Sequence, residues 1–138
     1  MAEELTGRCF CRAIRYRCGP PIYPPTLCHC ESCQRIAGAH ALGWFTVASG
    51  QHTYETGMPR EFESSPGVWR AFCSHCGTPL TYRNARRPGE LDVTICSLDE
   101  PGKMVPVDHI WMQDAPGWDR PQDGLPQYPA GRGRSDNS

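Results

Sequence analysis

Cys28-His29-Cys30-Glu31-Ser32-Cys33 places three thiols within six residues, and the rest of the chain can be understood as a frame that presents this cluster. Two further groups of closely spaced cysteines flank it, Cys9-x-Cys11 before it and Cys73-x-x-Cys76-Gly77 after it. Such spacings are typical of tight turns that supply two sulfur ligands at a time to zinc. The chain is therefore expected to fold around metal.

Length and composition predict the fold class. The 138 residues suit one domain with a modest core, to which metal cross-links would add stability. Gly and Pro number 14 each, which disfavours long helices and favours short strands joined by turns. We expect a mainly β fold, a small zinc-stabilised single domain over residues 1–130, with short antiparallel strands and at most one short helix. Residues 131–138 lack apolar bulk and are predicted to form a flexible C-terminal tail.

Charge and hydropathy argue against several classes of function. Lys and Arg total 14 against 15 Asp and Glu, so no positive field favours nucleic acid as a partner. The apolar run 41–48 is far shorter than the ~20 residues that cross a bilayer, and the N-terminus does not resemble a secretory signal. We therefore expect a cytoplasmic protein without a membrane partner. In a reducing compartment, nine cysteines indicate metal ligation rather than disulfides.

The alternation of apolar and polar residues predicts about seven short strands. The first is a half-buried strand over 6–18 that carries Phe10 on its buried face and Cys9-x-Cys11 at its start, both thiols to one side. A proline-rich stretch, 19–25, should then approach the cluster in an irregular, extended conformation. The remaining strands are predicted at residues 41–48, 53–56, 61–64, 68–72, 80–82 and 91–95.

One short helix and a covering segment complete the prediction. Residues 32–37 can form one or two helical turns that Gly38 ends in the left-handed conformation, with Cys33 in the first turn. From residue 113 onward the chain should wrap over the domain, held by three large aromatic anchors, namely Trp111, Trp118 and Tyr128.

The cysteines divide into two candidate metal sites. Joining Cys9 and Cys11 to Cys73 and Cys76 completes a closed four-cysteine zinc site of the structural kind. The central three-thiol cluster would then hold a second ion with an open fourth position, as a catalytic zinc requires. Three thiolates on Zn²⁺ leave a net charge of minus one, which suits a sulfur nucleophile or a thiol adduct better than hydroxide chemistry.

The residues leave alternatives open at the central cluster. A fourth ligand would make it a second structural zinc, and the candidates are His29, His75, Cys18 and Cys96. Redox-active iron is another candidate occupant, since thiolates also bind iron. Unless they ligate metal, Cys18 and Cys96 are predicted to be small buried apolar residues.

Other side chains near the motifs have weaker claims. His109 could face the cluster, although a histidine bonded to a backbone group is favoured. Arg35 could hold a substrate carboxylate or simply face solvent. Trp44 and Phe45 are predicted to lie in the core. His40 and His52 are predicted to lie at the surface.

A family resemblance rests on five motifs taken in order, namely Gly7-x-Cys9-x-Cys11, Cys28-His-Cys30-x-x-Cys33-x-Arg35-x-x-Gly38, Phe72-Cys73-x-x-Cys76-Gly77-Thr78, Ser97-Leu98-Asp99 and His109-Ile110-Trp111. Over about 6–128, the chain resembles the glutathione-dependent formaldehyde-activating enzyme and centromere protein V family. The resemblance implies a mainly antiparallel β fold with two zinc ions per chain, one structural and one catalytic. By motif, the structural ligands are Cys9, Cys11, Cys73 and Cys76, and the catalytic ligands are Cys28, Cys30 and Cys33.

The resemblance also implies a reaction, in which a small thiol such as glutathione adds to formaldehyde or another aldehyde. This is a zinc-dependent carbon-sulfur lyase reaction run in reverse, with a small-molecule thiol and an aldehyde as the partners. Two residues depart from the family pattern. Cys96 stands where a small residue usually precedes Ser-Leu-Asp, and Gln34 occupies a position that is often basic. The alternative function is a non-catalytic, zinc-stabilised protein-interaction module.

Overall fold

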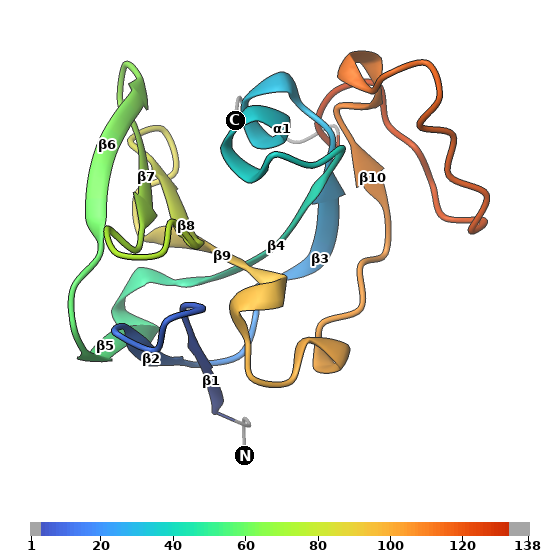
Figure 1. Ribbon diagram of the computed structural model, residues 1–138. Coiled ribbons are helices and arrows are strands. Elements are labelled where there is room, and N and C mark those ends of the chain that lie inside the picture. Colours follow the sequence, from blue (N-terminus) through green and yellow to red (C-terminus); the bar gives the residue numbers. More distant parts are fainter. Residues whose placement is uncertain (1–3, 133–138) are drawn as a thin grey trace.

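The computed structural model describes residues 4–132, which form a mainly β fold with two sheets and one short α-helix (Figure 1). The strands are β1 (Leu5–Arg8), β2 (Arg15–Cys18), β3 (Tyr23–Cys28), β4 (Leu42–Ala48), β5 (His52–Thr56), β6 (Arg60–Ser65), β7 (Val68–Phe72), β8 (Pro79–Asn84), β9 (Glu90–Thr94) and β10 (His109–Ile110). The large sheet has the order β10-β3-β4-β9-β8-β7-β6, and the small sheet has the order β1-β2-β5. All neighbouring strands pair antiparallel except β10 and β3, which pair parallel. The predicted fold class is confirmed.

The single strand predicted over 6–18 is instead a hairpin. β1 and β2 pair antiparallel, with Arg8 opposite Arg15, and residues 9–14 turn the chain back. Arg12 adopts a positive φ of 72° in this turn. Because the turn interrupts the strand period, Phe10 is 84% exposed and does not lie on a buried face. The Cys9-x-Cys11 pair therefore lies on a turn and not on an extended strand.

The proline-rich stretch is extended, as predicted, but it also forms the paired strand β3, which was not predicted. Pro24 and Pro25 fall where the register of β3 against β4 shifts, between Tyr23 and Thr26. Prolines cannot donate to a ladder, so they are tolerated where the pairing is irregular. β3 then carries the chain directly to Cys28, its last residue.

The later elements follow the prediction closely. β4 to β9 each lie within two residues of the predicted bounds. The helix α1 (Glu31–Ala37) ends at Gly38, whose φ of 61° allows its N–H to donate to the carbonyl of Gln34. No helix among residues 4–132 is long and apolar enough to span a membrane.

Two apolar clusters form the interior. The larger one contains Phe45, Val47 and Leu80, together with Cys9 and Cys73. The smaller one surrounds the central thiols and includes three side chains of the large sheet, Trp44, Val68 and Tyr82. Both Trp44 and Phe45 are buried, as predicted. The flanking cysteines and the central cysteines thus belong to different parts of the core.

The segment after β10 lies beyond this edge strand of the large sheet and contacts α1 (Figure 1). Trp111 packs against the smaller apolar cluster, and the backbone of Tyr128 bonds to His109 and Met112. Trp118 is 74% exposed, so its predicted role as a buried anchor is wrong. Its ring lies near the exposed His40 ring in an edge-to-face arrangement, with centroids 5.9 Å apart.

Most of the predicted tail, 133–138, lies outside the described residues. Within 131–132, the guanidinium of Arg132 donates to the carboxylate of Asp108 and to the carbonyl oxygens of Pro24 and Pro25. Arg132 therefore ties the end of the described chain to β3, close to the central thiols.

Candidate metal centres

The first candidate centre joins two distant turns. The turn after β1 brings Cys9 and Cys11 to Cys73 and Cys76, which lie between β7 and β8, and the four sulfur atoms lie within 4.8 Å of one another. The Cys9–Cys11 and Cys11–Cys73 sulfur distances are both 3.7 Å. A tetrahedral zinc with bonds of about 2.3 Å requires sulfur separations of about 3.8 Å. The geometry therefore fits zinc.

The backbone of the second turn is shaped for this role. Gly77 adopts the left-handed conformation, with a φ of 83°. Its N–H donates to the Cys73 carbonyl at 2.8 Å, and the N–H of His75 donates to the Cys73 sulfur at 3.4 Å. Burial opposes ionisation of Cys76, but hydrogen bonds from Thr78 lower the pKa of this thiol to about 5.

The second candidate centre is local in sequence. Cys28 ends β3, Cys30 caps the N-terminus of α1, and Cys33 lies in the first turn of that helix. Their sulfur atoms lie within 4.8 Å of one another. Hydrogen bonds from the neighbouring thiols lower the pKa of Cys30, and the contact with Cys30 raises the pKa of Cys28 well above its usual value. These three sulfurs could hold a metal ion such as zinc.

The histidines do not supply a fourth ligand to the central cluster. His29 is buried, and its ring nitrogens contact Asp119 at 2.7 Å and His109 at 2.9 Å. His75 is exposed on the other cysteine turn. Among residues 4–132, no His, Cys, Asp or Glu joins the three central sulfurs in one ligand group.

The two remaining cysteines lie away from the central cluster. Cys18 is buried in the larger apolar cluster, as predicted for a small apolar residue. Cys96 is exposed, contrary to prediction, because the 3₁₀ turn Ile95–Ser97 directs Ile95 and Ser97 inward and Cys96 outward. All nine cysteines are free thiols in the structure.

Several predictions about single polar residues need correction. The ring of His109 bonds to the side chains of His29 and Asp123 and not to a backbone group. His52 was predicted at the surface but stacks on Tyr16 with ring centroids 5.0 Å apart, and its buried Nε2 has no hydrogen-bond partner among residues 4–132. For Arg35, the predicted solvent-facing alternative is the one observed, since the side chain is largely exposed and pairs with Glu31.

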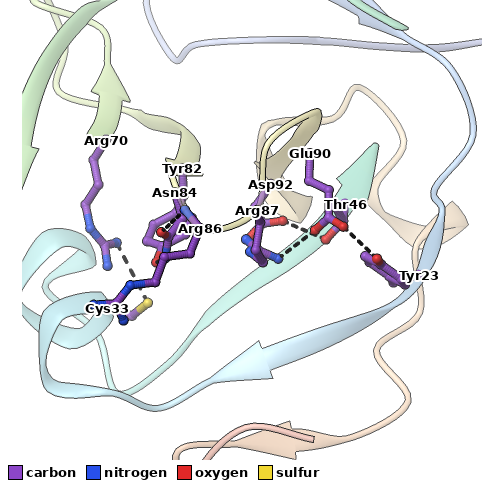
Figure 2. Close-up of polar contacts among 10 residues, drawn as sticks. All are labelled: Tyr23, Cys33, Thr46, Arg70, Tyr82, Asn84, Arg86, Arg87, Glu90 and Asp92. Atoms are coloured by element: carbon purple, nitrogen blue, oxygen red, sulfur yellow. Dashed lines mark hydrogen bonds and ion pairs between the residues drawn. The ribbon is translucent and has the colours of Figure 1, made fainter. Parts of the chain in front are cut away.

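The central cluster faces a cavity of about 50 Å³, space for only a small molecular group. Its polar lining includes Arg70 on β7, Tyr82 on β8 and Arg87 in the turn that follows. In Figure 2, Arg70 points at Cys33, whereas Arg87 points at Asp92. The distances are 3.9 Å from Nη1 of Arg70 to the Cys33 sulfur and 2.5 Å from Nη2 of Arg87 to the Asp92 carboxylate.

Tyr82 also lines this cavity. Its hydroxyl oxygen accepts a hydrogen bond from the Asn84 amide at 3.1 Å, which leaves the hydroxyl proton available to another acceptor. Burial raises the pKa of Tyr82 to about 12, so the group stays protonated at neutral pH. Sequence analysis missed both Tyr82 and Arg70. The alternation of β7 carried a signal for Arg70, since it shares strand parity with the buried Val68.

The fold and these two clusters define a small β protein with two cysteine centres that could hold zinc, one closed by protein ligands and one facing a cavity. The family model of the glutathione-dependent formaldehyde-activating enzyme matches residues 4–114, and the chain belongs to this family.

A solved structure of a Rhodobacter sphaeroides protein, a structural genomics target, has the same fold. It is 16% identical to this chain, with a TM-score of 0.61 over 89% of this chain and 98% of the other. No curated protein matches the sequence.

Proposed function

We propose that this chain is a zinc-dependent carbon-sulfur lyase that joins a small thiol, glutathione or a similar compound, to formaldehyde or another aldehyde, or cleaves such adducts. One observation carries the proposal. The sulfurs of Cys28, Cys30 and Cys33 converge beside a cavity, and residues 4–132 offer them no fourth protein ligand. A catalytic zinc needs such a position for substrate, whereas a structural zinc is closed.

Two zinc ions per chain follow from the proposal. Cys9, Cys11, Cys73 and Cys76 would hold the structural ion, and Cys28, Cys30 and Cys33 would hold the catalytic ion. When bound at the three-cysteine centre, zinc supplies a Lewis acid at the open position. Three surrounding thiolates lessen its power to acidify water, which favours thiol chemistry over hydrolysis.

The reaction needs one new bond and one proton transfer. The thiol sulfur bonds to the aldehyde carbon, the carbon–oxygen π bond breaks, and the thiol proton ends on the aldehyde oxygen. We assign to the Tyr82 hydroxyl the stabilisation of the charge that develops on this oxygen, because Tyr82 lines the cavity and keeps its proton at neutral pH.

The cavity volume bears on the choice of substrate. About 50 Å³ can receive a one-carbon aldehyde and a sulfur atom, but it is too small for a tripeptide. The bulk of a thiol such as glutathione would then lie outside the cavity. This arrangement favours the smallest aldehyde and tolerates variation in the thiol.

Exchange NMR spectroscopy of formaldehyde with glutathione, and separately with other small thiols, tests the proposal. The protein should accelerate exchange between free and thiol-bound formaldehyde, and Cys28→Ser should abolish the acceleration while the chain stays folded. Lack of acceleration with every thiol would exclude this chemistry with formaldehyde. An unfolded Cys28→Ser variant would instead indicate that both metal sites are structural.

A further inference from the structure

Three arginines line the cavity beside the central thiols, and their charges are balanced differently. Arg87 contacts the carboxylates of Asp92 and Glu90. Arg132 contacts the carboxylate of Asp108 at 2.6 Å. Arg70 differs from both, because no Asp or Glu oxygen among residues 4–132 lies within ion-pair distance of its guanidinium.

Among the groups that surround Arg70, the central thiols are the ones that can carry a compensating negative charge. The residue is only 6% exposed. Its Nε donates to the Ser64 hydroxyl at 3.3 Å, its guanidinium lies over the Tyr82 ring at 4.9 Å, and its Nη1 reaches the Cys33 sulfur at 3.9 Å. The hydroxyl and the ring are uncharged, and a buried cation without an anion is strongly unfavourable.

We propose that Arg70 is a positioning residue that serves as the counter-charge of the three-cysteine centre. This inference rests on the proposed function, since it requires a metal ion at Cys28, Cys30 and Cys33. Three thiolates on Zn²⁺ carry a net charge of minus one, and the Arg70 guanidinium brings the total to zero. A substrate thiolate then enters a neutral centre and meets less repulsion.

The effect on metal binding can be measured without any substrate. Arg70→Gln should weaken zinc binding at the central cluster by about ten- to a hundredfold, the range found when a residue that supports metal ligands is lost. Competition with a chromophoric chelator measures this affinity in the full chain. The four-cysteine site serves as an internal reference and should keep its affinity.

Two further variants separate charge from packing. Arg70→Lys keeps a cation in the same cavity and should stay within a fewfold of wild type. Arg83→Gln removes an arginine of β8 that pairs with Glu61 and does not line the cavity, and it should leave the central affinity unchanged. Equal zinc affinities in wild type and Arg70→Gln would overturn the inference. An equal loss of zinc affinity in Arg70→Gln and Arg70→Lys would overturn it as well.

The wild-type chain provides a second measurement that does not depend on the folding of Arg70→Gln. In ¹⁵N-resolved NMR spectra of arginine side chains, zinc should shift the Nε–H resonance of Arg70 more than those of Arg87 and Arg132. Failure of Arg70 to respond would overturn the inference even in a metal-loaded protein. A wild-type chain that binds no metal at the central cluster would instead contradict the proposed function itself.

Discussion

The rings of His29 and His109 meet nitrogen to nitrogen, with 2.9 Å between Nε2 of His29 and Nδ1 of His109. Each ring contacts a carboxylate through its other nitrogen, Asp119 at 2.7 Å and Asp123 at 2.8 Å. Since His29 lies between two of the central cysteines, this row of four side chains links the three-cysteine centre to the C-terminal segment. The segment therefore stabilises the loop that would hold the metal.

Removal of Asp119 should destabilise the protein more than removal of Asp123. The Asp119 side chain is 8% exposed and that of Asp123 is 42% exposed. Asp119→Ala leaves the buried Nδ1 of His29 without its hydrogen-bond partner, at a cost of about 1–3 kcal/mol, whereas water can replace Asp123. Urea unfolding of both variants measures the difference. Equal losses in the free energy of unfolding would show that burial of the carboxylate does not affect stability at this site.

The two cysteine clusters should respond differently to mutation. Cys73→Ser breaks the closed four-cysteine site, and structural zinc sites can contribute about 10–16 kcal/mol of binding free energy to folding. The variant should therefore lose its cooperative thermal transition in circular dichroism. Cys28→Ser should retain that transition while its zinc content falls from two ions per chain to one. Loss of the transition in both variants would contradict separate roles.

Tyr82→Phe should lower kcat/KM for adduct formation by about a hundredfold, if its hydroxyl stabilises developing charge as one donor of an oxyanion hole does. Zinc content and thermal stability should change little, because only the hydroxyl is removed. Tyr54→Phe is the matched control, since Tyr54 is half-buried but does not line the cavity. The same rate for Tyr82→Phe and Tyr54→Phe would exclude the role given to Tyr82.

Protonation of His52 should contribute to acid destabilisation. Burial lowers the pKa of His52 from 6.5 to about 4. Between these two pH values the unfolded chain binds a proton that the folded chain does not, so stability is fully present above pH 6.5 and falls as pH drops towards 4. His52→Gln should lose less stability than wild type over this range in urea titrations. Parallel pH profiles would contradict the prediction, and comparing the two proteins at each pH cancels any shared loss of zinc.

Local sequence signals predicted the elements that depend on local chemistry. Alternation located β4 to β9, and Gly38 marked the end of α1. β10 was missed because two residues in a parallel pair have no periodicity of their own. The exposure of Trp118 could not be predicted either, because it depends on what the folded C-terminal segment contacts.

In the candidate site, too, the sequence predicted what depends on local spacing and missed what depends on packing. Cysteine spacing indicated both ligand groups, which the structure brings together. The roles of Arg70 and Tyr82 depend on how β7 and β8 pack against α1. A charged residue within a strand usually faces solvent. The sequence therefore indicated the burial of Arg70 only weakly, through the strand parity that it shares with Val68.

Strand β7 contributes to both candidate metal centres. Arg70 extends from it towards Cys33, and Cys73 follows its last residue, Phe72. An ion at the four-cysteine site fixes the end of this strand and so restricts where the Arg70 side chain can lie. Metal loading should then be sequential and cooperative, with the first ion raising affinity for the second. Zinc supply could thereby govern how much of the protein is competent for chemistry, which a stepwise zinc titration would detect as two coupled transitions.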